Sequence, residues 1–214
     1  MSFGQTFTYY HDALDRLRPL GKEAPPFLIF QIKANLAYVE SLLQKDPQEC
    51  RRMLTEALDL AQHEPSIPRL NVAAAQSTLG GILLNEGKYA EAEPVLRKSV
   101  EMFTQANARS AEAASPIYLL VVLYGRQNNF AAARDYARQY YDLAKSLLGP
   151  DSVMAAEGEL LWARYRADTG EPAPAMQQVL EALPVIRRTF PPLSVNLWTP
   201  LAAAAHVFNA AGLF

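Results

Sequence analysis

Residues 87–92 have the sequence GKYAEA, and related segments recur along the chain. Residues 128–133 (NNFAAA) and 170–175 (GEPAPA) are similar to it, and a last trace, GLF, stands at residues 212–214. The first residues of these four segments are spaced 41, 42 and 42 positions apart. Self-similarity at a fixed period of about 20–50 residues is typical of chains built from stacked structural repeats. The period holds over most of the chain, so it decides the fold.

Each period contains two helical patterns. Between residues 88 and 106, apolar or small residues such as Ala92, Leu96 and Phe103 recur at intervals of three and four. This spacing places them on one face of an α-helix, and residues 70–85 show a similar pattern. No run of alternating β-branched residues indicates a strand. We therefore expect an all-α fold of antiparallel helix pairs, with Gly or Asn in the left-handed conformation inside each pair.

The composition excludes several classes of protein. The chain of 214 residues is 50% hydrophobic and 20% charged, with a formal net charge of -2. Because basic residues do not outnumber acidic ones, the charge argues against nucleic acid or a membrane surface as partner. The single Cys50 excludes an internal disulfide, and no Cys/His cluster indicates zinc. The N-terminus lacks a signal-peptide pattern. The apolar segment 193–214 contains Asn196, Pro200 and His206, which favours a buried helix over a membrane span. We expect a cytoplasmic protein.

Residues 79–92 fit the pattern L-G-x-x-L-x-x-x-G-x-Y-x-x-A, which resembles the tetratricopeptide repeat, a helix-turn-helix unit. The period exceeds the common length of about 34 residues. Together with LLGPD at residues 147–151, this longer period resembles the repeats of kinesin light chains, and the resemblance covers residues 24–214. It implies an α-solenoid: a right-handed superhelix of about ten helices, in which the first helix of each pair lines a concave surface.

The repeats predict one solenoid domain over residues 1–214. Its expected parts are a half-repeat at 3–20, repeats at 24–64, 66–107, 109–149 and 151–191, and a half-repeat at 193–214. A solenoid needs polar caps at its ends, because each repeat buries its surface only against its neighbours. The last helix shows no such cap. We expect either a fragment of a longer array, or a terminal helix that is buried by self-association or by a partner.

Several departures from the repeat pattern make further predictions. Small residues stand where two helices approach closely, at Cys50, Ala92, Ala133 and Ala175, and again seven positions later at Ala57, Ser99 and Ala182. Tyr140 breaks this second series, which predicts a wider stack there or a ring that is turned outward. The first repeat has Asp46-Pro47 in place of Gly or Asn, so its turn must differ. Pro116 and Pro184 should bend their helices, unless a helix begins just before Pro116 at Ser115.

No motif indicates catalysis. Residues 81–88 differ from a phosphate-binding loop, because five residues separate the glycines and Tyr89 replaces the Ser or Thr that would bind magnesium. His11, His63 and His206 fall in different helices, without a carboxylate or cysteine at ligand spacing. We expect no catalytic residue, no metal and no cofactor.

A binding surface is therefore the best candidate for a functional site. The groove-facing positions that the resemblance implies are Asn35, Ser77, Asn85, Tyr118, Arg126, Glu157, Arg164 and His206. Their amides and hydroxyls could hold a peptide backbone, and Arg126 and Arg164 could hold carboxylates. The asparagine with which kinesin light chains help to hold cargo peptides is matched only by Asn35 in this sequence, so the resemblance does not extend to the whole of that cargo-binding pattern.

The leading hypothesis is a non-catalytic scaffold that binds a peptide or protein partner in its concave groove. Two alternatives remain open. One is a sensor module of a larger bacterial signalling protein that responds to a peptide or small ligand. The other is a structural spacer or oligomerisation segment.

Overall fold

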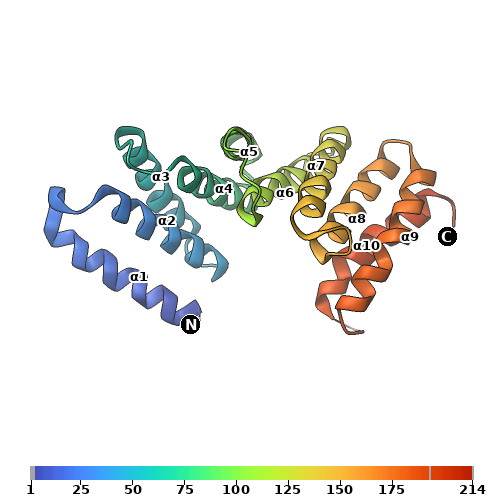
Figure 1. Cartoon of the computed structure of the whole chain (residues 1–214), viewed down its shortest axis with the longest axis horizontal. Helices are drawn as coiled ribbons and strands as arrows, with labels where there is room; N and C mark the ends of the chain where they lie inside the picture. The colour runs from blue at the N-terminus through green and yellow to red at the C-terminus, as the bar shows by residue number, and fades with distance from the viewer. Residues whose placement is uncertain (1–2, 193, 214) are drawn as a thin grey trace. The chain divides into compact units, whose positions relative to one another are not determined.

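The computed structural model describes residues 3–192 and 194–213, and this part of the chain is helical without a strand (Figure 1). It divides into two compact units, Met1–Ala108 and Arg109–Phe214, which we call unit 1 and unit 2. Unit 1 contains α1 (Phe3–Leu17), α2 (Pro26–Leu42), α3 (Pro47–His63), α4 (Arg69–Asn85) and α5 (Tyr89–Gln105). Unit 2 contains α6 (Ala111–Arg126), α7 (Phe130–Leu148), α8 (Val153–Asp168), α9 (Pro172–Thr189) and α10 (Trp198–Ala210). Two short 3-10 helices, Arg18–Glu23 and Val195–Leu197, precede α2 and α10.

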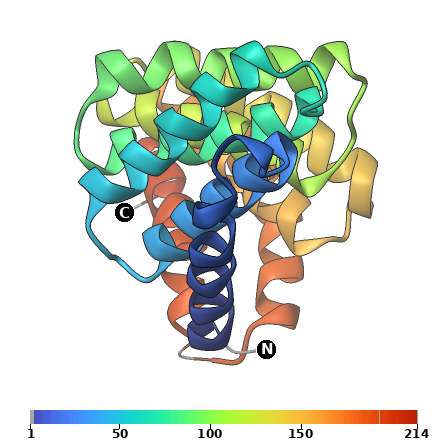
Figure 2. The same ribbon diagram turned by 90° about the vertical axis from the view of Figure 1, so that its left-hand side faces the viewer.

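Within each unit, consecutive helices pack as pairs. In unit 1, α2 packs on α3 and α4 on α5, while α1 covers α2 and stands at the front of Figure 2 in dark blue. In unit 2, α6 packs on α7 and α8 on both α7 and α9, and α10 packs against α8 and α9. The predicted all-α fold and its ten helices are thereby confirmed for the described residues. The division into one domain with the repeat boundaries given above stays a prediction. Leu193 and Phe214, which bound its last half-repeat, lie outside the described residues.

The turns within the helix pairs have the predicted left-handed geometry. The φ angles of Gly87, Asn128 and Gly170 are 76°, 57° and 93°. Each turn closes its helix with the hydrogen bonds of a Schellman motif: the backbone N–H of Lys88, for example, donates to the carbonyl of Leu83 at 2.9 Å. Glycine adopts this conformation without the steric cost that a Cβ imposes, which explains why the period is marked by glycine.

The first repeat uses the same geometry with different residues. Gln44 takes the left-handed position with a φ of 53°, and the N–H of Lys45 donates to the carbonyl of Glu40 at 3.0 Å. Asp46 is the N-cap of α3, and its side chain accepts a hydrogen bond from the N–H of Gln48 at 2.9 Å. The end of α2 therefore has the same left-handed geometry, but the turn differs in length, because α3 begins at Pro47, three residues after the left-handed residue. By comparison, α5 begins at Tyr89, two residues after Gly87.

The small residues of the second helices are buried as predicted, but Tyr140 does not behave as expected. Cys50, Ala92, Ala133 and Ala175 are fully buried. Tyr140 is also buried, with 8% of its surface exposed, so the expectation of an outward ring is wrong. The stack does not widen there either: a Cβ added at Gly158 of α8 would lie 2.9 Å from the Cα of Tyr141. Gly158 gives Tyr140 the room that a small residue was expected to provide.

Two prolines lie inside helices. The N-cap of α6 is Ser110, whose hydroxyl accepts from the N–H of Ala113, and α6 begins at Ala111. A helix start at Ser115 is therefore wrong, and Pro116 lies within the helix, as Pro184 does within α9. A bend at either proline stays a prediction. None of the described helices is long and apolar enough to cross a bilayer.

Candidate functional site

The candidate groove residues of unit 1 lie on α2 and α4. Asn35 is half-buried on α2, where its amide donates a hydrogen bond to the hydroxyl of Tyr10 on α1 at 3.2 Å. Ser77 is buried within α4, with 5% of its surface exposed, whereas Asn85 is exposed at the end of the same helix. Asn35 is the residue that matches the cargo-binding position of kinesin light chains, and here its amide is hydrogen-bonded to α1.

Unit 2 brings two of the predicted residues into one cavity of about 480 Å³. Tyr118 reaches it from α6 and Glu157 from α8, and α10 adds a wall that includes Thr199. Tyr140 and Phe190 add further aromatic surface. We call this space the unit 2 cavity. Most of its lining residues come from α8, from α10 and from the segment between α9 and α10, while α6 and α7 contribute Tyr118 and Tyr140.

The aromatic part of the cavity depends on a departure from the repeat pattern. Tyr140 lies on α7, a second helix, and its ring is 5.6 Å from the ring of Tyr118, with the two planes tilted by 50°. The ring can reach this position because α8 has a glycine, Gly158, beneath it. Burial raises the pKa of Tyr140 to about 12, and the nearby charge of Glu157 adds to this shift. The repeat pattern marks Tyr140 as an exception but does not connect it with a site.

Glu157 is the charged residue of the cavity. Its side chain is half-buried, and burial raises the pKa of its carboxyl group. No described residue forms a hydrogen bond or ion pair with this carboxylate. A carboxylate that loses water without gaining a partner is costly, so the position favours a ligand that can donate hydrogen bonds or carry positive charge.

The remaining predicted residues of unit 2 lie outside the cavity. Nε2 of His206 on α10 lies 2.6 Å from Oδ1 of Asp168 on α8, so this histidine joins two first helices. The guanidinium of Arg164 lies 5.4 Å from the centre of the Tyr165 ring, and its Nε is buried without a hydrogen-bond partner. Arg126 is exposed at the end of α6.

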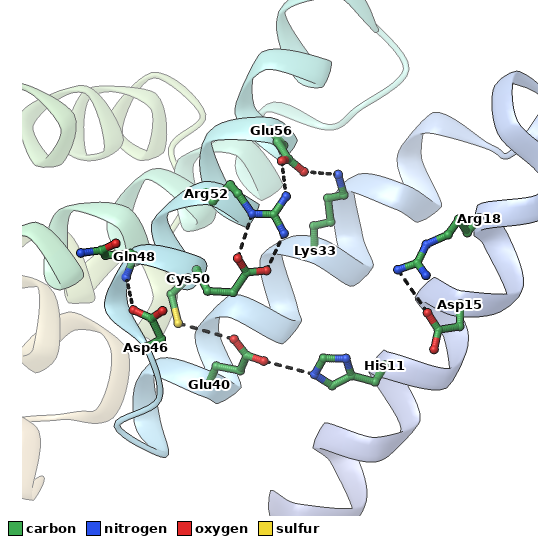
Figure 3. A network of polar contacts seen from close by, with 11 residues as sticks. His11, Asp15, Arg18, Lys33, Glu40, Asp46, Gln48, Cys50, Arg52 and Glu56 are labelled. Carbon is green, nitrogen blue, oxygen red and sulfur yellow. Dashed lines mark hydrogen bonds and ion pairs between the residues drawn. The ribbon is translucent and has the colours of Figure 1, made fainter.

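The fold also assembles a polar network in unit 1 that sequence analysis missed (Figure 3). The thiol of Cys50 donates to Oε2 of Glu40 at 3.7 Å, and Oε1 of Glu40 lies 3.2 Å from Nε2 of His11. The carboxylate stands between the thiol and the imidazole, so His11 cannot take a proton directly from Cys50. Burial, and then the charge of Glu40, raise the pKa of the thiol to about 11. Cys50 is therefore a protonated, buried side chain at neutral pH, unsuited to nucleophilic catalysis.

A second cavity, of about 390 Å³, lies beside this network between α1, α2 and α3. Its charged side chains are paired (Figure 3): Lys33 lies 2.6 Å from Glu56, and Arg52 contacts both Glu56 and Glu49. Hydrogen bonds from Arg52 and Lys33 lower the pKa of Glu49 and Glu56 respectively. The charged side chains of this cavity therefore form ion pairs with one another. Over the described part of the chain, no three His, Cys, Asp or Glu side chains gather into a metal site.

Comparisons with known proteins agree with this architecture. The structure of BtubC (BKLC) from P. vanneervenii is similar with a TM-score of 0.77 and 16% identity, over 100% of this chain and 86% of that one. A Podosopora anserina protein named for kinesin light chain, with nearly identical TPR-like repeats, gives a TM-score of 0.69 and 15% identity, over 88% and 89% of the two chains. At these identities the likeness concerns the fold, and it agrees with the expected kinesin-light-chain type of repeat.

The sequence itself matches a known family. No curated protein matches the chain. The family profile of the tetratricopeptide repeat matches residues 28–105 and 71–146, which together span more than half of the chain. These matches include residues 79–92 and 128–133, two of the segments that carry the repeat pattern. The chain belongs to the tetratricopeptide-repeat family.

Proposed function

We propose that this chain is a non-catalytic scaffold, and that it binds a peptide or protein partner on the face of unit 2 formed by α6, α8 and α10. The family is built from helix pairs that present such faces. The observation that carries the proposal is the unit 2 cavity, which contains Tyr118 and Glu157 from the expected groove.

The size and chemistry of the cavity fit this role. Its volume of about 480 Å³ lies within the range of about 300–1,000 Å³ that is typical of ligand pockets. Aromatic and aliphatic walls supply contact area, and a few polar groups can fix the orientation of a ligand. In this proposal Arg126 and Arg164 hold carboxylates of a longer peptide, whereas His206 stays in contact with Asp168. Asn35, Ser77 and Asn85 of unit 1 have no part in this cavity.

The proposal can be tested with the full chain and a random peptide library displayed on phage. Thr199 is exposed at the cavity, so Thr199→Trp should fill the cavity without disturbing the core. Ala205→Trp places the same ring on an exposed position of α10 outside the cavity and is the matched control. We expect selected peptides to bind the original chain and the control, and to lose affinity for Thr199→Trp.

The outcomes separate the alternatives. A spacer segment would select no peptide, which would overturn the proposal. Peptides that bind Thr199→Trp as tightly as the original chain would overturn the choice of this cavity. A small-ligand sensor would select no peptide, but a small molecule would raise the unfolding temperature of the original chain and not that of Thr199→Trp.

Self-association through residues 193–214 is a further part of the proposal. Val195 and Trp198 expose 78% and 76% of their surface, which is unusual for large apolar side chains. If α10 forms an interface between copies, Trp198→Ser should lower the sedimentation coefficient at high protein concentration. A monomer for both forms at all concentrations would contradict it.

A further inference from the structure

The charges that line the two cavities described above differ in one respect. In the unit 1 cavity the acidic and basic side chains satisfy one another, as with Lys33 and Glu56. In the unit 2 cavity Glu157 is the only charged side chain among the described residues that line it, and it has no ion pair. The unit 2 cavity therefore carries an uncompensated negative charge on its wall.

The surroundings of this charge suit a cation better than a neutral group. Tyr118, Tyr140 and Phe190 present aromatic surface to the same space as the carboxylate. Aromatic faces attract ammonium and guanidinium groups, and this attraction is stronger where water is excluded. Burial raises the pKa of Glu157 because it disfavours the charged carboxylate. A cation that enters the cavity would offset this cost.

We propose that the unit 2 cavity binds the side chain of a lysine or arginine from a peptide partner, with its charge on Glu157 and its methylene groups against Tyr118 and Tyr140. Long basic side chains combine an apolar stem with a charged end, which matches a cavity with an apolar wall and one carboxylate. This inference rests on the proposed function, because it names the residue that the peptide inserts.

The edge of the cavity favours a peptide over a small free cation. Asn196 and Thr199 line it and are exposed, so their side chains lie where the backbone of an inserted residue would pass. An amide and a hydroxyl can both donate to and accept from peptide groups. The basic side chain would then supply the charge, and the peptide backbone would supply hydrogen bonds at the edge.

The test uses the full chain, the random phage-displayed library, and two variants with matched chemistry. Glu157→Gln removes the charge of the cavity while keeping the shape of the side chain. Glu159→Gln removes a carboxylate from the same helix that is also half-buried with a raised pKa but does not line the cavity. We expect the original chain and Glu159→Gln to enrich peptides with lysine or arginine, and Glu157→Gln to lose this enrichment. Thermal unfolding shows whether the two variants remain equally folded.

A double-mutant cycle then assigns the contact. A selected peptide is compared with a form in which its basic residue is replaced by glutamine. Binding should weaken about tenfold or more for the original chain, the effect expected of one charged hydrogen bond, and change little for Glu157→Gln. An equal loss of affinity in the original chain and in Glu157→Gln would overturn this inference and leave the proposed function standing. The same holds if the selected peptides contain no basic residue and yet fail to bind Thr199→Trp. A library that yields no cavity-dependent peptide would overturn both.

Discussion

Tyr140 on α7 and Gly158 on α8 fit one another where two successive helix pairs meet. A Cβ added at Gly158 would lie 2.9 Å from Cδ1 of Tyr140 and 2.9 Å from the Cα of Tyr141. Both distances are too short for a real side chain, so the tyrosine ring occupies the space that the glycine leaves free. Here the small residue stands on α8 and the large one on α7. The ring of Tyr140 therefore lies in the wall of the unit 2 cavity, next to the ring of Tyr118.

Gly158→Ala should destabilise the protein for this reason. Overpacking typically costs about 1–3 kcal/mol, whereas alanine gains about 1 kcal/mol over glycine inside a helix. Because the backbone of Tyr141 cannot move away independently, we expect a net loss of about 1–2 kcal/mol in the free energy of unfolding. Chemical denaturation measures it.

Gly125→Ala is the control for that substitution. Gly125 also lies in a helix of unit 2, but the atoms near an added Cβ belong to the side chain of Tyr165 and not to a backbone. A side chain can yield more easily, so we expect a smaller loss than at Gly158. Equal losses, or a stabilised Gly158→Ala, would show that α7 and α8 do not approach as closely as described.

The sequence was sufficient to predict the fold because the information was local and repeated. The left-handed turns at Gly87 and Gly170 follow from the steric freedom of glycine, and the period showed where the helix pairs divide. The turn at Gln44 was harder to predict, since glutamine carries no such preference. Its geometry became visible only from the backbone hydrogen bonds that close α2.

The candidate site was predicted less well because it depends on contacts across helices. Tyr118 and Glu157 were both expected in a groove, and both line the unit 2 cavity. The partnership of Tyr140 with Gly158 was missed, although a large residue that breaks the repeat pattern is a signal to look for a glycine on a neighbouring helix. The contact of His11 with Glu40, 29 residues away, has no signal in sequence spacing.

Gln44→Gly should stabilise the protein. Gln44 is exposed and holds a left-handed conformation, which costs a residue with a Cβ about 1 kcal/mol or more. Glycine removes this cost but gains freedom in the unfolded chain, so we expect a net gain of about 0.5–1 kcal/mol. Gln44→Ala keeps the Cβ and serves as the control, with little change expected. A urea unfolding midpoint that does not rise for Gln44→Gly would contradict the turn geometry.

Ser99→Ala should weaken the contact between α5 and α4. The hydroxyl of Ser99 is buried and donates to the carbonyl of Ala73 at 2.7 Å. Losing one buried hydrogen bond costs about 0.5–1.5 kcal/mol of unfolding free energy, measurable by urea denaturation. Thr104→Ala removes an exposed hydrogen bond from the same helix, to the carbonyl of Val100, and should change stability by no more than about 0.5 kcal/mol. A loss at Thr104 as large as that at Ser99 would argue against a special role for the buried bond.

The raised pKa of Cys50 predicts a loss of stability in alkaline solution. Burial, and then the charge of Glu40, move the pKa of the folded thiol from 9.0 to about 11. Between these two values the unfolded chain loses the thiol proton while the folded chain keeps it. The contribution to stability is therefore complete below pH 9 and decreases as the pH rises toward about 11. Cys50→Ala lacks this ionisation but keeps the tyrosines and lysines, so its urea midpoint should fall less over the same interval. Parallel curves for the two forms would show that the thiol ionises equally easily in the folded and unfolded chains.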